Sequence, residues 1–295
     1  MRISDVLAGQ PAANPIDPKT RLGHVHLVVN DLDRVSAFYQ DVLGFRVHRR
    51  EADTVALGAG GEDLLRLTAR RDARYYRRAG GLYHTAFLVP NRVDLAQWLR
   101  RIAETETPIH GMVDHWTHEA IYLPDPEGNG IELAWDRPRE QWPPFTDLIA
   151  RGNGPLDPQD LVSEIADPAA GWTLNPQTQV GHVHLHTGNL ELSDGFYRDV
   201  LGFDGTVKLP GQMSFVAAGG YHHHIGYNLW RGAGIPPRPA DAAGIDYLTV
   251  VLPDDTAREK VIARVEAAGL DMSAHPEGVL LRDPAGIGVL LTAAA

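Results

Sequence analysis

Hydrophobic positions near the start of the chain change from a strand pattern to a helix pattern and back. Residues 23–29 (GHVHLVV) have the pattern of a short buried strand. The next segment places apolar residues at helical spacing, namely Leu32, Val35, Phe38, Tyr39 and Val42. Asp31 suits the N-cap of this helix, and Gly44 suits its end. Three further strands fit at residues 45–49, 53–57 and 64–68. The pattern predicts a βαβββ unit over residues 21–70.

The same order of elements recurs over residues 81–137. Residues 82–90 (LYHTAFLVP) have a strand pattern, and residues 93–104 have a helix pattern. The apolar residues that cluster on this second helix are Val93, Leu95, Ala96 and Leu99. Three strands then fit at Ile109–Asp114, Glu119–Leu123 and Gly130–Trp135. The first part of the chain is therefore predicted to contain two βαβββ modules.

The second part of the chain repeats the first at an offset of 158 residues. The pentapeptide GHVHL occurs at residues 23–27 and again at 181–185. The segments FYQDVLGF and FYRDVLGF follow the two copies, and Asp125-Pro126 matches Asp283-Pro284. A repeat of this kind predicts two homologous halves. We therefore expect four modules in all.

These modules define the expected domain organisation. Residues 1–20 are an N-terminal extension. The first domain spans 21–137, with module one at 21–70 and module two at 81–137. Residues 138–178 are a linker, because the stretch Pro138–Gly171 is rich in proline, glycine and aspartate. We expect it to contain one short helix. The second domain spans 179–295, with module three at 179–232 and module four at 244–293.

Composition narrows the class of protein. The 295 residues include no cysteine, which excludes disulfides, thiolate metal sites and a cysteine nucleophile. The start of the chain has no apolar core of signal-peptide length, so a cytoplasmic location is expected. A net charge of -11 argues against general nucleic-acid binding, and no apolar run approaches a membrane span. The 14 histidines are unusual, because several lie in segments with a strand pattern.

Two motifs and the modular order resemble a known superfamily. They are GHVxL followed by FYxDVLGF, and the segment YLPDPEGNGIEL at residues 122–133. The vicinal oxygen chelate superfamily has such motifs, and it includes glyoxalase I, bleomycin-resistance proteins and extradiol dioxygenases. The chain resembles most closely the ring-cleaving dioxygenases similar to catechol 2,3-dioxygenase. The resemblance implies an α+β fold in which the four modules form two cupped mixed sheets. It does not select among the activities of the superfamily.

In that superfamily the metal ligands come from the first strands of two modules and the last strand of one. The first-strand residues of modules one to four are His24, His84, His182 and Tyr247. The last-strand residue is Glu132 in module two and Leu290 in module four. Module four therefore lacks ligands, and the resemblance implies His84, Glu132 and either His182 or His24. Two imidazoles and one carboxylate suit Fe(II), with Mn(II) as the alternative.

The resemblance also implies catalytic residues around these ligands. Extradiol enzymes of the superfamily carry a tyrosine ten residues before the ligand glutamate, and Tyr122 stands there. They also carry a histidine shortly before that tyrosine. In this chain that histidine is His115 or, alternatively, His118. An acid/base histidine is expected on the fourth strand of the module that gives the first ligand. Only module three offers one, in the run His222–His224, where strand alternation favours His223 and a slip of one residue favours a neighbour.

Module three thus offers both a ligand and an acid/base histidine. We therefore expect a site built across the two halves, as in the hydroquinone-type ring-cleaving dioxygenases, with modules two and three facing each other. His182 then completes the set and His24 is a vestigial copy. The alternative, in which His24 joins His84 and Glu132 within the first half, stays open.

The expected function is extradiol cleavage of a catechol- or hydroquinone-type ring by non-haem Fe(II) and O2, in aromatic compound catabolism. Tyr227 and Trp135 are candidates to contact the substrate.

The alternative functions are a glyoxalase-like isomerase or lyase and a metal-free binding or resistance protein. Arg66 stands near the place where an isomerase would have its second carboxylate, which counts against that reading. The expected partners are a small aromatic molecule and O2, with no nucleic acid or membrane, and a homo-oligomer is left open.

Overall fold

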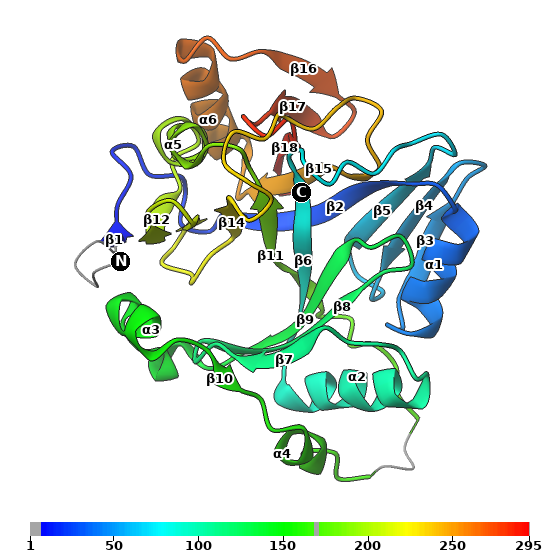
Figure 1. The fold of residues 1–295 in the computed structure, drawn as a ribbon. Helices are drawn as coiled ribbons and strands as arrows, with labels where there is room; N and C mark the ends of the chain where they lie inside the picture. The colour runs from blue at the N-terminus through cyan, green and yellow to red at the C-terminus, as the bar shows by residue number, and fades with distance from the viewer. Residues whose placement is uncertain (1–6, 168–170, 295) are drawn as a thin grey trace.

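Two mixed sheets form the framework of the chain (Figure 1). The computed structural model describes residues 7–167 and 171–294. Each sheet contains two of the repeated modules. The prediction of an α+β fold with four βαβββ modules in two mixed sheets is confirmed.

The ten-stranded sheet combines modules two and three. Module two contributes β6 (Gly81–Val89), β7 (Gly111–Asp114), β8 (His118–Pro124) and β9 (Gly130–Asp136). Module three contributes β11 (Gln179–His186), β12 (Asp204–Leu209), β13 (Met213–Ala217) and β14 (Ile225–Asn228). The edge strands are β1 (Leu7–Gln10) and β10 (Gly154–Pro155). The strand order is β1-β12-β13-β14-β11-β6-β9-β8-β7-β10, so the two modules meet where β11 pairs with β6.

The eight-stranded sheet combines modules one and four. Module one contributes β2 (Arg21–Val29), β3 (Arg46–Arg50), β4 (Thr54–Gly58) and β5 (Asp63–Ala69). Module four contributes β15 (Gly244–Leu252), β16 (Met272–His275), β17 (Gly278–Arg282) and β18 (Gly288–Ala293). The order is β16-β17-β18-β15-β2-β5-β4-β3, with β15 and β2 antiparallel at the centre.

The two halves of the sequence are therefore crossed in space. The first GHVHL segment lies in β2, beside module four, and the second lies in β11, beside module two. Figure 1 shows β6 and β11 side by side at the middle of the molecule. The two-domain division describes the repeat in the sequence, whereas each sheet draws on both halves.

Each module has one helix after its first strand. These helices are α1 (Leu32–Asp41), α2 (Arg92–Glu104), α5 (Leu190–Asp194) and α6 (Asp255–Ala267). A π-helical turn over Gly195–Val200 continues α5. All four helices begin after an Asp or Asn whose side chain accepts a hydrogen bond from a backbone N–H of the first turn, as predicted for Asp31. Gly44 and Gly202 follow two of them at φ values of 75° and 93°, where glycine is favoured.

The core is continuous between the two sheets. It is formed by the inner faces of the strands and by the apolar faces of the helices. The largest fully buried side chains include Tyr39, Phe87, Trp98, Tyr197 and Phe203. Trp98 on α2 donates a hydrogen bond from Nε1 to the carbonyl of Leu43 at 2.9 Å, which links modules one and two. No helix in the described part of the chain is long and apolar enough to cross a membrane.

The linker is more structured than predicted. Instead of one short helix it contains a 3-10 turn (Arg139–Gln141), α3 (Phe145–Arg151), β10 and α4 (Pro158–Ser163). The strand β10 pairs with β7, and Leu161 on α4 is fully buried. The expected N-terminal extension likewise adds β1 to the edge of the sheet, beside β12. These pairings join segments far apart in sequence, which local patterns do not report.

Candidate metal centre and pocket

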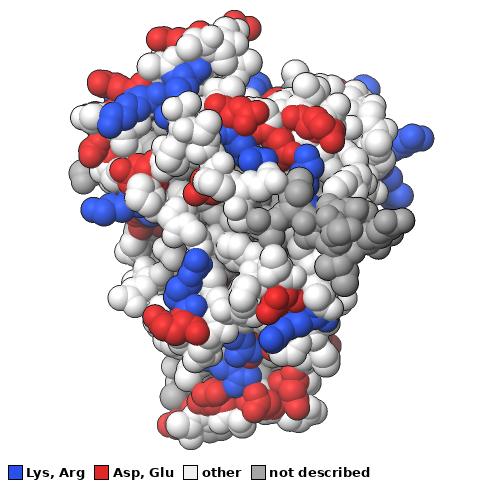
Figure 2. All heavy atoms as spheres, turned by 90° about the vertical axis from the view of Figure 1, so that its left-hand side faces the viewer, with Lys and Arg blue, Asp and Glu red and all other residues white. Residues whose placement is uncertain are grey.

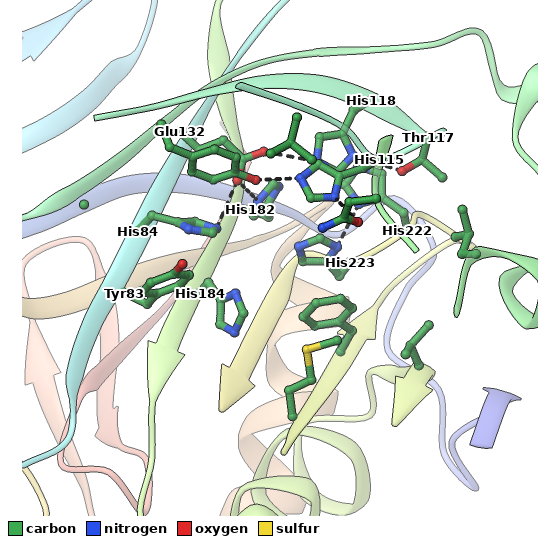
Figure 3. A pocket seen from close by; sticks show the side chains of 18 of the residues that line it. Tyr83, His84, His115, Thr117, His118, Glu132, His182, His184, His222 and His223 are labelled. Carbon is green, nitrogen blue, oxygen red and sulfur yellow. Dashed lines mark hydrogen bonds and ion pairs between the residues drawn. The ribbon is translucent and has the colours of Figure 1, made fainter. Parts of the chain in front are cut away.

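A pocket of about 560 Å³ lies on the ten-stranded sheet (Figure 3). Strands β6 to β9, strands β11 to β13, the segment before β14, and α3 all contribute to its walls. Its histidines are His84, His110, His115, His118, His182, His184, His222 and His223. Six of these are buried in the protein, and they surround one buried carboxylate, that of Glu132.

The carboxylate of Glu132 is the centre of the cluster. Its Oε2 lies 3.0 Å from Nε2 of His84 and 3.0 Å from Nε2 of His182. Its Oε1 lies 3.0 Å from Nε2 of His118. The contact with His182 has hydrogen-bond geometry, but both ring nitrogens of His84 and Oε1 of Glu132 have no hydrogen-bond partner. Buried polar atoms are rarely left in this state, and a divalent cation among them would satisfy them.

Strand register brings the three ligand candidates together. Ala86 in β6 is opposite Glu132 of β9 on one side and opposite His182 of β11 on the other. His84 lies two residues before Ala86, and therefore on the same face of β6. The small Ala86 side chain leaves room between the three. Gly130 allows β9 to approach β6, because a Cβ there would lie 1.9 Å from the carbonyl oxygen of Tyr83.

The protonation states suit a divalent metal. Burial raises the pKa of Glu132, but the imidazoles of His182, His84 and His118 outweigh it and hold the pKa well below its ordinary value. Burial lowers the pKa of His84 to about 3. At neutral pH the glutamate is therefore ionised and His84 is neutral. Metal ligands need these states, so the residues fit the expected ion.

A four-residue turn, His115-Trp116-Thr117-His118, brings two histidines into the pocket. Trp116 has a φ of 66°, which is unusual for a large side chain, and its Nε1 donates to the carbonyl of Gly152 at 2.8 Å. The rings of His115 and His118 stack at 4.5 Å. Burial lowers the pKa of His118, but the adjacent carboxylate of Glu132 outweighs burial and raises it.

His115 and Tyr122 form a hydrogen-bonded pair whose direction can be deduced. His115 Nε2 lies 2.7 Å from the Tyr122 hydroxyl, and its Nδ1 lies 3.0 Å from Oδ1 of Asn153. Because Oδ1 can only accept, Nδ1 of His115 carries the proton. Burial lowers the pKa of His115 to about 4, and burial with the charge of Glu132 raises that of Tyr122 well above 10. Tyr122 is thus a neutral phenol that donates to Nε2 of His115.

An ion-pair network supports this turn from the opposite face of the sheet. Glu119, 3% exposed, accepts from Arg92 Nε and Arg137 Nη2 at 2.8 Å each. Arg137 also binds Asp114 at 2.8 Å, so β7, β8 and the segment after β9 are held together. Arg92 extends the network to Asp160 on α4 at 2.6 Å. The turn that carries His115 and His118 is therefore fixed at both ends.

The run His222–His224 differs from the predicted alternation. His222 and His223 both line the pocket, while His224 turns away and its Nδ1 accepts from the backbone N–H of Ala218 at 3.1 Å. The expectation that His222 faces away from the pocket is wrong, because the run precedes β14 instead of lying within it. Nδ1 of His222 lies 2.8 Å from Nδ1 of His223, and the ring of His223 stacks on Phe215 at 4.2 Å.

Three other residues named from the sequence lie outside the pocket. His24 is in the eight-stranded sheet, where Nε2 lies 3.2 Å from the Tyr247 hydroxyl. Tyr227 is 1% exposed and donates to Asp194 at 2.5 Å. Trp135 packs partly buried against the hydrophobic core. None of the three lines the pocket, so His24 is not placed to bind a metal there, and Tyr227 and Trp135 are not placed to contact a substrate there.

Some pocket residues were missed in the sequence. His184 follows His182 at a spacing of two, so strand alternation alone would have placed both on one face. Its Nε2 lies 3.0 Å from the side-chain nitrogen of Asn228. Asn153 had no signal, because it lies in the linker and reaches His115 only through the pairing of β10 with β7.

Comparisons with known proteins agree with this architecture. The model of the Glyoxalase/Bleomycin resistance protein/Dioxygenase superfamily matches residues 21–133. The chain is 38% identical to catechol-2,3-dioxygenase of Bacillus subtilis (strain 168) over 279 residues, covering 91% of this chain and 95% of that protein. The chain belongs to this superfamily, as its motifs indicated, and this relative is an enzyme of the kind expected.

Solved structures share the fold at low sequence identity. A candidate dioxygenase from Bacillus subtilis subsp. subtilis str. 168 has a TM-score of 0.64 at 14% identity, covering 95% of this chain and 86% of that chain. Glyoxalase I from Zea mays has a TM-score of 0.58 at 18% identity, covering 92% of both chains. These likenesses show the fold alone, and the function has to be argued from the site.

Proposed function

We propose that this chain is an extradiol ring-cleaving dioxygenase that uses O2 to open a catechol- or hydroquinone-type ring. The observation that carries the proposal is the meeting of His84, His182 and Glu132 in one pocket with the His115–Tyr122 pair and His223. The similarity to catechol-2,3-dioxygenase over most of the chain supports it.

His84, His182 and Glu132 would hold the metal, Fe(II) or alternatively Mn(II). When bound, the ion supplies a Lewis acid that lowers the pKa of a substrate hydroxyl and brings the ring and O2 together. Two imidazoles and one carboxylate leave positions open for substrate oxygens, as such a reaction requires. His118 contacts the second carboxylate oxygen, so Glu132 is held in one orientation.

The protein's own groups provide the proton transfers. Burial lowers the pKa of His223 well below its ordinary value, so its imidazole is neutral and can accept a proton from a substrate hydroxyl. The ring of His223 lies 4.2 Å from that of His182, centre to centre, so this base is beside the proposed ligand. The Tyr122 hydroxyl donates its hydrogen bond to Nε2 of His115, so the Tyr122 oxygen remains free to accept a hydrogen bond from the second hydroxyl of the substrate.

The reaction needs no further reductant. The bond between a hydroxyl-bearing carbon and its neighbour outside the diol breaks, and each of the two carbons receives one atom of O2. The ring supplies the four electrons that O2 takes up. Protons removed from the diol return to the product, so His223 ends the cycle as it began, as a neutral imidazole. The buried site keeps bulk water away from the reacting ring.

The alternatives within the superfamily have less support. A glyoxalase-like isomerase is expected to use a second carboxylate, and Arg66, near its expected place in sequence, lies in the other sheet. A metal-free binding protein would not need to bury Glu132 among three histidines. It would also have no reason to leave Oε1 of Glu132 and both ring nitrogens of His84 without hydrogen-bond partners. Metal content separates the binding protein from both enzymes, and O2 uptake separates the two enzymes.

The test is O2 uptake by Fe(II)-loaded protein, prepared without oxygen, on a panel of catechols and hydroquinones. We expect one O2 per ring and a yellow ring-opened product from catechols. Glu132→Ala should lose the metal, whereas His223→Ala should keep it and lose turnover by about 10²-fold or more. Stoichiometric metal with full activity in Glu132→Ala would contradict the proposal, as would turnover of a glutathione hemithioacetal without O2 uptake.

A further inference from the structure

The pocket is much larger than the ring whose cleavage is proposed. Its volume is about 560 Å³, whereas a cavity of about 150 Å³ is enough to hold benzene. The histidines and Glu132 occupy one part of its wall. A second part of the wall, which the proposed chemistry does not use, is the apolar arm. It is formed by Val207 and Leu209 of β12, Met213 and Phe215 of β13, and Phe145, Leu148 and Ile149 of α3.

The apolar arm begins beside His223 and follows the β12–β13 hairpin. Phe215 stacks on His223 at 4.2 Å and is the cross-strand neighbour of Val207. Leu209 and Met213 form the next cross-strand pair on the same face. Two residues along a strand span roughly 7 Å, so this second pair lies well beyond the reach of a single ring at the metal centre.

The helix α3 forms the opposite side of the arm. Its pocket-lining residues, Phe145, Leu148 and Ile149, have the spacing of one helical face. Thr146 and Asp147 on the other face are exposed. The three apolar side chains are only partly buried by the protein, so a ligand in the arm would remove further apolar surface from water.

The apolar arm offers no cationic side chain as a counter-ion for an anionic group. Among the described residues, no lysine or arginine lines it. Figure 2 shows the face that carries β1 and α3, where acidic and basic side chains are mixed instead of gathered into a basic area. A buried carboxylate without a partner is strongly disfavoured, so a ring with a charged substituent would bind poorly. Rings at the mouth, from Tyr83 and Trp230, are 5.0 Å apart and extend the aromatic lining.

We propose that the apolar arm is a subsite for an uncharged alkyl or aryl substituent on the substrate ring. The substrate class is then a catechol or hydroquinone with a lipophilic substituent, as opposed to a carboxylated ring or a glutathione adduct. The identity of the ring rests on the proposed function, but the preference of the arm rests on its lining alone. Binding and turnover therefore test different statements.

The first experiment measures binding without turnover. The protein is titrated calorimetrically with 4-alkylphenols of one to six carbons, which have no second hydroxyl. It is also titrated with phenols of the same chain lengths in which the 4-alkyl chain ends in a carboxylate. We expect the dissociation constant of the alkylphenols to fall about threefold to fourfold per methylene. The carboxylates should bind at least about 30-fold more weakly. Affinity that is independent of chain length, or carboxylates that bind as well, would overturn the proposal.

A charge variant tests the location of the subsite. Leu148→Arg places a cation in the arm and should reduce the difference, so that carboxylates bind at least about tenfold better than in the unchanged protein. Leu192→Arg is the matched control, because Leu192 is also an apolar helix residue but is 60% exposed outside the pocket. Equal effects of the two variants on carboxylate binding would place the subsite elsewhere and overturn the assignment.

Turnover of 4-alkylcatechols by the Fe(II)-loaded protein then separates the two proposals. If binding follows chain length and no catechol is cleaved, the subsite stands and the ring-cleavage proposal falls. If catechol is cleaved but kcat/KM is insensitive to chain length and charge, the ring-cleavage proposal stands and the subsite falls. We expect kcat/KM to rise with chain length in parallel with affinity.

Discussion

The two sheets come from the same repeat, but only one of them contains the buried cluster of His84, His182 and Glu132. In the ten-stranded sheet Ala86 is opposite Glu132, and in the eight-stranded sheet Thr249 is opposite Leu290. His84 lies two residues before Ala86 in β6, and Tyr247 lies two residues before Thr249 in β15. The backbone register is thus preserved, while the side chains that can bind a metal are present on one side only.

The eight-stranded sheet uses its charged groups in internal pairs. Arg66 makes two contacts of 2.7 Å with Glu277 and one of 2.9 Å with Asp63. His24 Nε2 lies 3.2 Å from the Tyr247 hydroxyl. Each of these groups has a hydrogen-bond partner within the protein, whereas neither ring nitrogen of His84 has one. The same fold therefore carries different side chains in its two sheets, and a buried carboxylate in contact with three histidines distinguishes the ten-stranded sheet.

The largest expected effect comes from changing the two equivalent histidines separately. His182→Ala should weaken metal binding by more than about 100-fold and abolish turnover, because it removes one of the three proposed ligands. His24→Ala should keep the metal and most turnover, and should lose about 1 kcal/mol of stability with the contact to Tyr247. Metal titration and denaturant unfolding of both variants measure the difference. Loss of metal in His24→Ala with its retention in His182→Ala would reverse the assignment.

A smaller effect is expected where the linker reaches the candidate metal centre. Asn153→Leu removes the acceptor that fixes the His115 tautomer, so kcat should fall about tenfold with little change in KM or metal content. Asn153→Asp should restore most of kcat, because a carboxylate also accepts from Nδ1. It should also raise the pKa of His115 in the pH–rate profile.

Asn175→Leu is the matched control for this variant. Asn175 is another linker asparagine, and it donates to Asp94 at 2.9 Å outside the pocket. We expect it to lower stability and to leave kcat unchanged. If Asn153→Leu behaves like this control, the tautomer argument is wrong.

The smallest effect is expected at a feature that the two sheets share. Asp125 and Asp283 occupy equivalent turns, and burial raises the pKa of each to about 6. The folded protein therefore holds a proton on Asp283 that the unfolded chain loses near pH 4, so ionisation reduces the free energy of unfolding as pH rises from about 4 to 6. Asp283→Asn removes this loss.

The measurement is the free energy of unfolding of Asp283→Asn and of the unchanged protein from pH 4 to 7. The variant should gain about 1 to 3 kcal/mol relative to the unchanged protein over this range. Asn is the suitable replacement because its side chain can still accept from the backbone N–H of Ile287 and contact Tyr197. Parallel stability curves would show that Asp283 is already ionised at pH 4.

Local patterns were sufficient to predict the modules, and the resemblance to the superfamily indicated much of the cluster. The N-cap Asp31, the glycine after each FYxDVLGF helix and the strands that carry His84 and Glu132 are encoded within a few residues of their positions. Tyr122 was named from the resemblance, and the structure places it in the same pocket. These features depend on strand alternation and helix ends, which a single sequence reports well.

The features that were not predicted depend on contacts between distant segments. The helix α3 and Asn153 reach the pocket only because β10 pairs with β7, and a segment rich in proline and glycine gives no sign of this. His222 enters the pocket because the chain is still irregular before β14, so strand alternation does not apply there. The crossed pairing of modules was inferred from one histidine run, since no local pattern specifies which module lies beside which.

The crossed pairing also decides when the chain can fold during its synthesis. His24 and Tyr247 meet at the centre of the eight-stranded sheet and are 223 residues apart in sequence. At a synthesis rate of about 5–20 residues per second, β2 waits roughly 10 to 45 seconds for its neighbour β15. Until then its apolar face and unpaired edge are open to other chains. Cutting the chain between the halves would leave each fragment without the strand that pairs with its central strand, because β2 pairs with β15 and β6 pairs with β11.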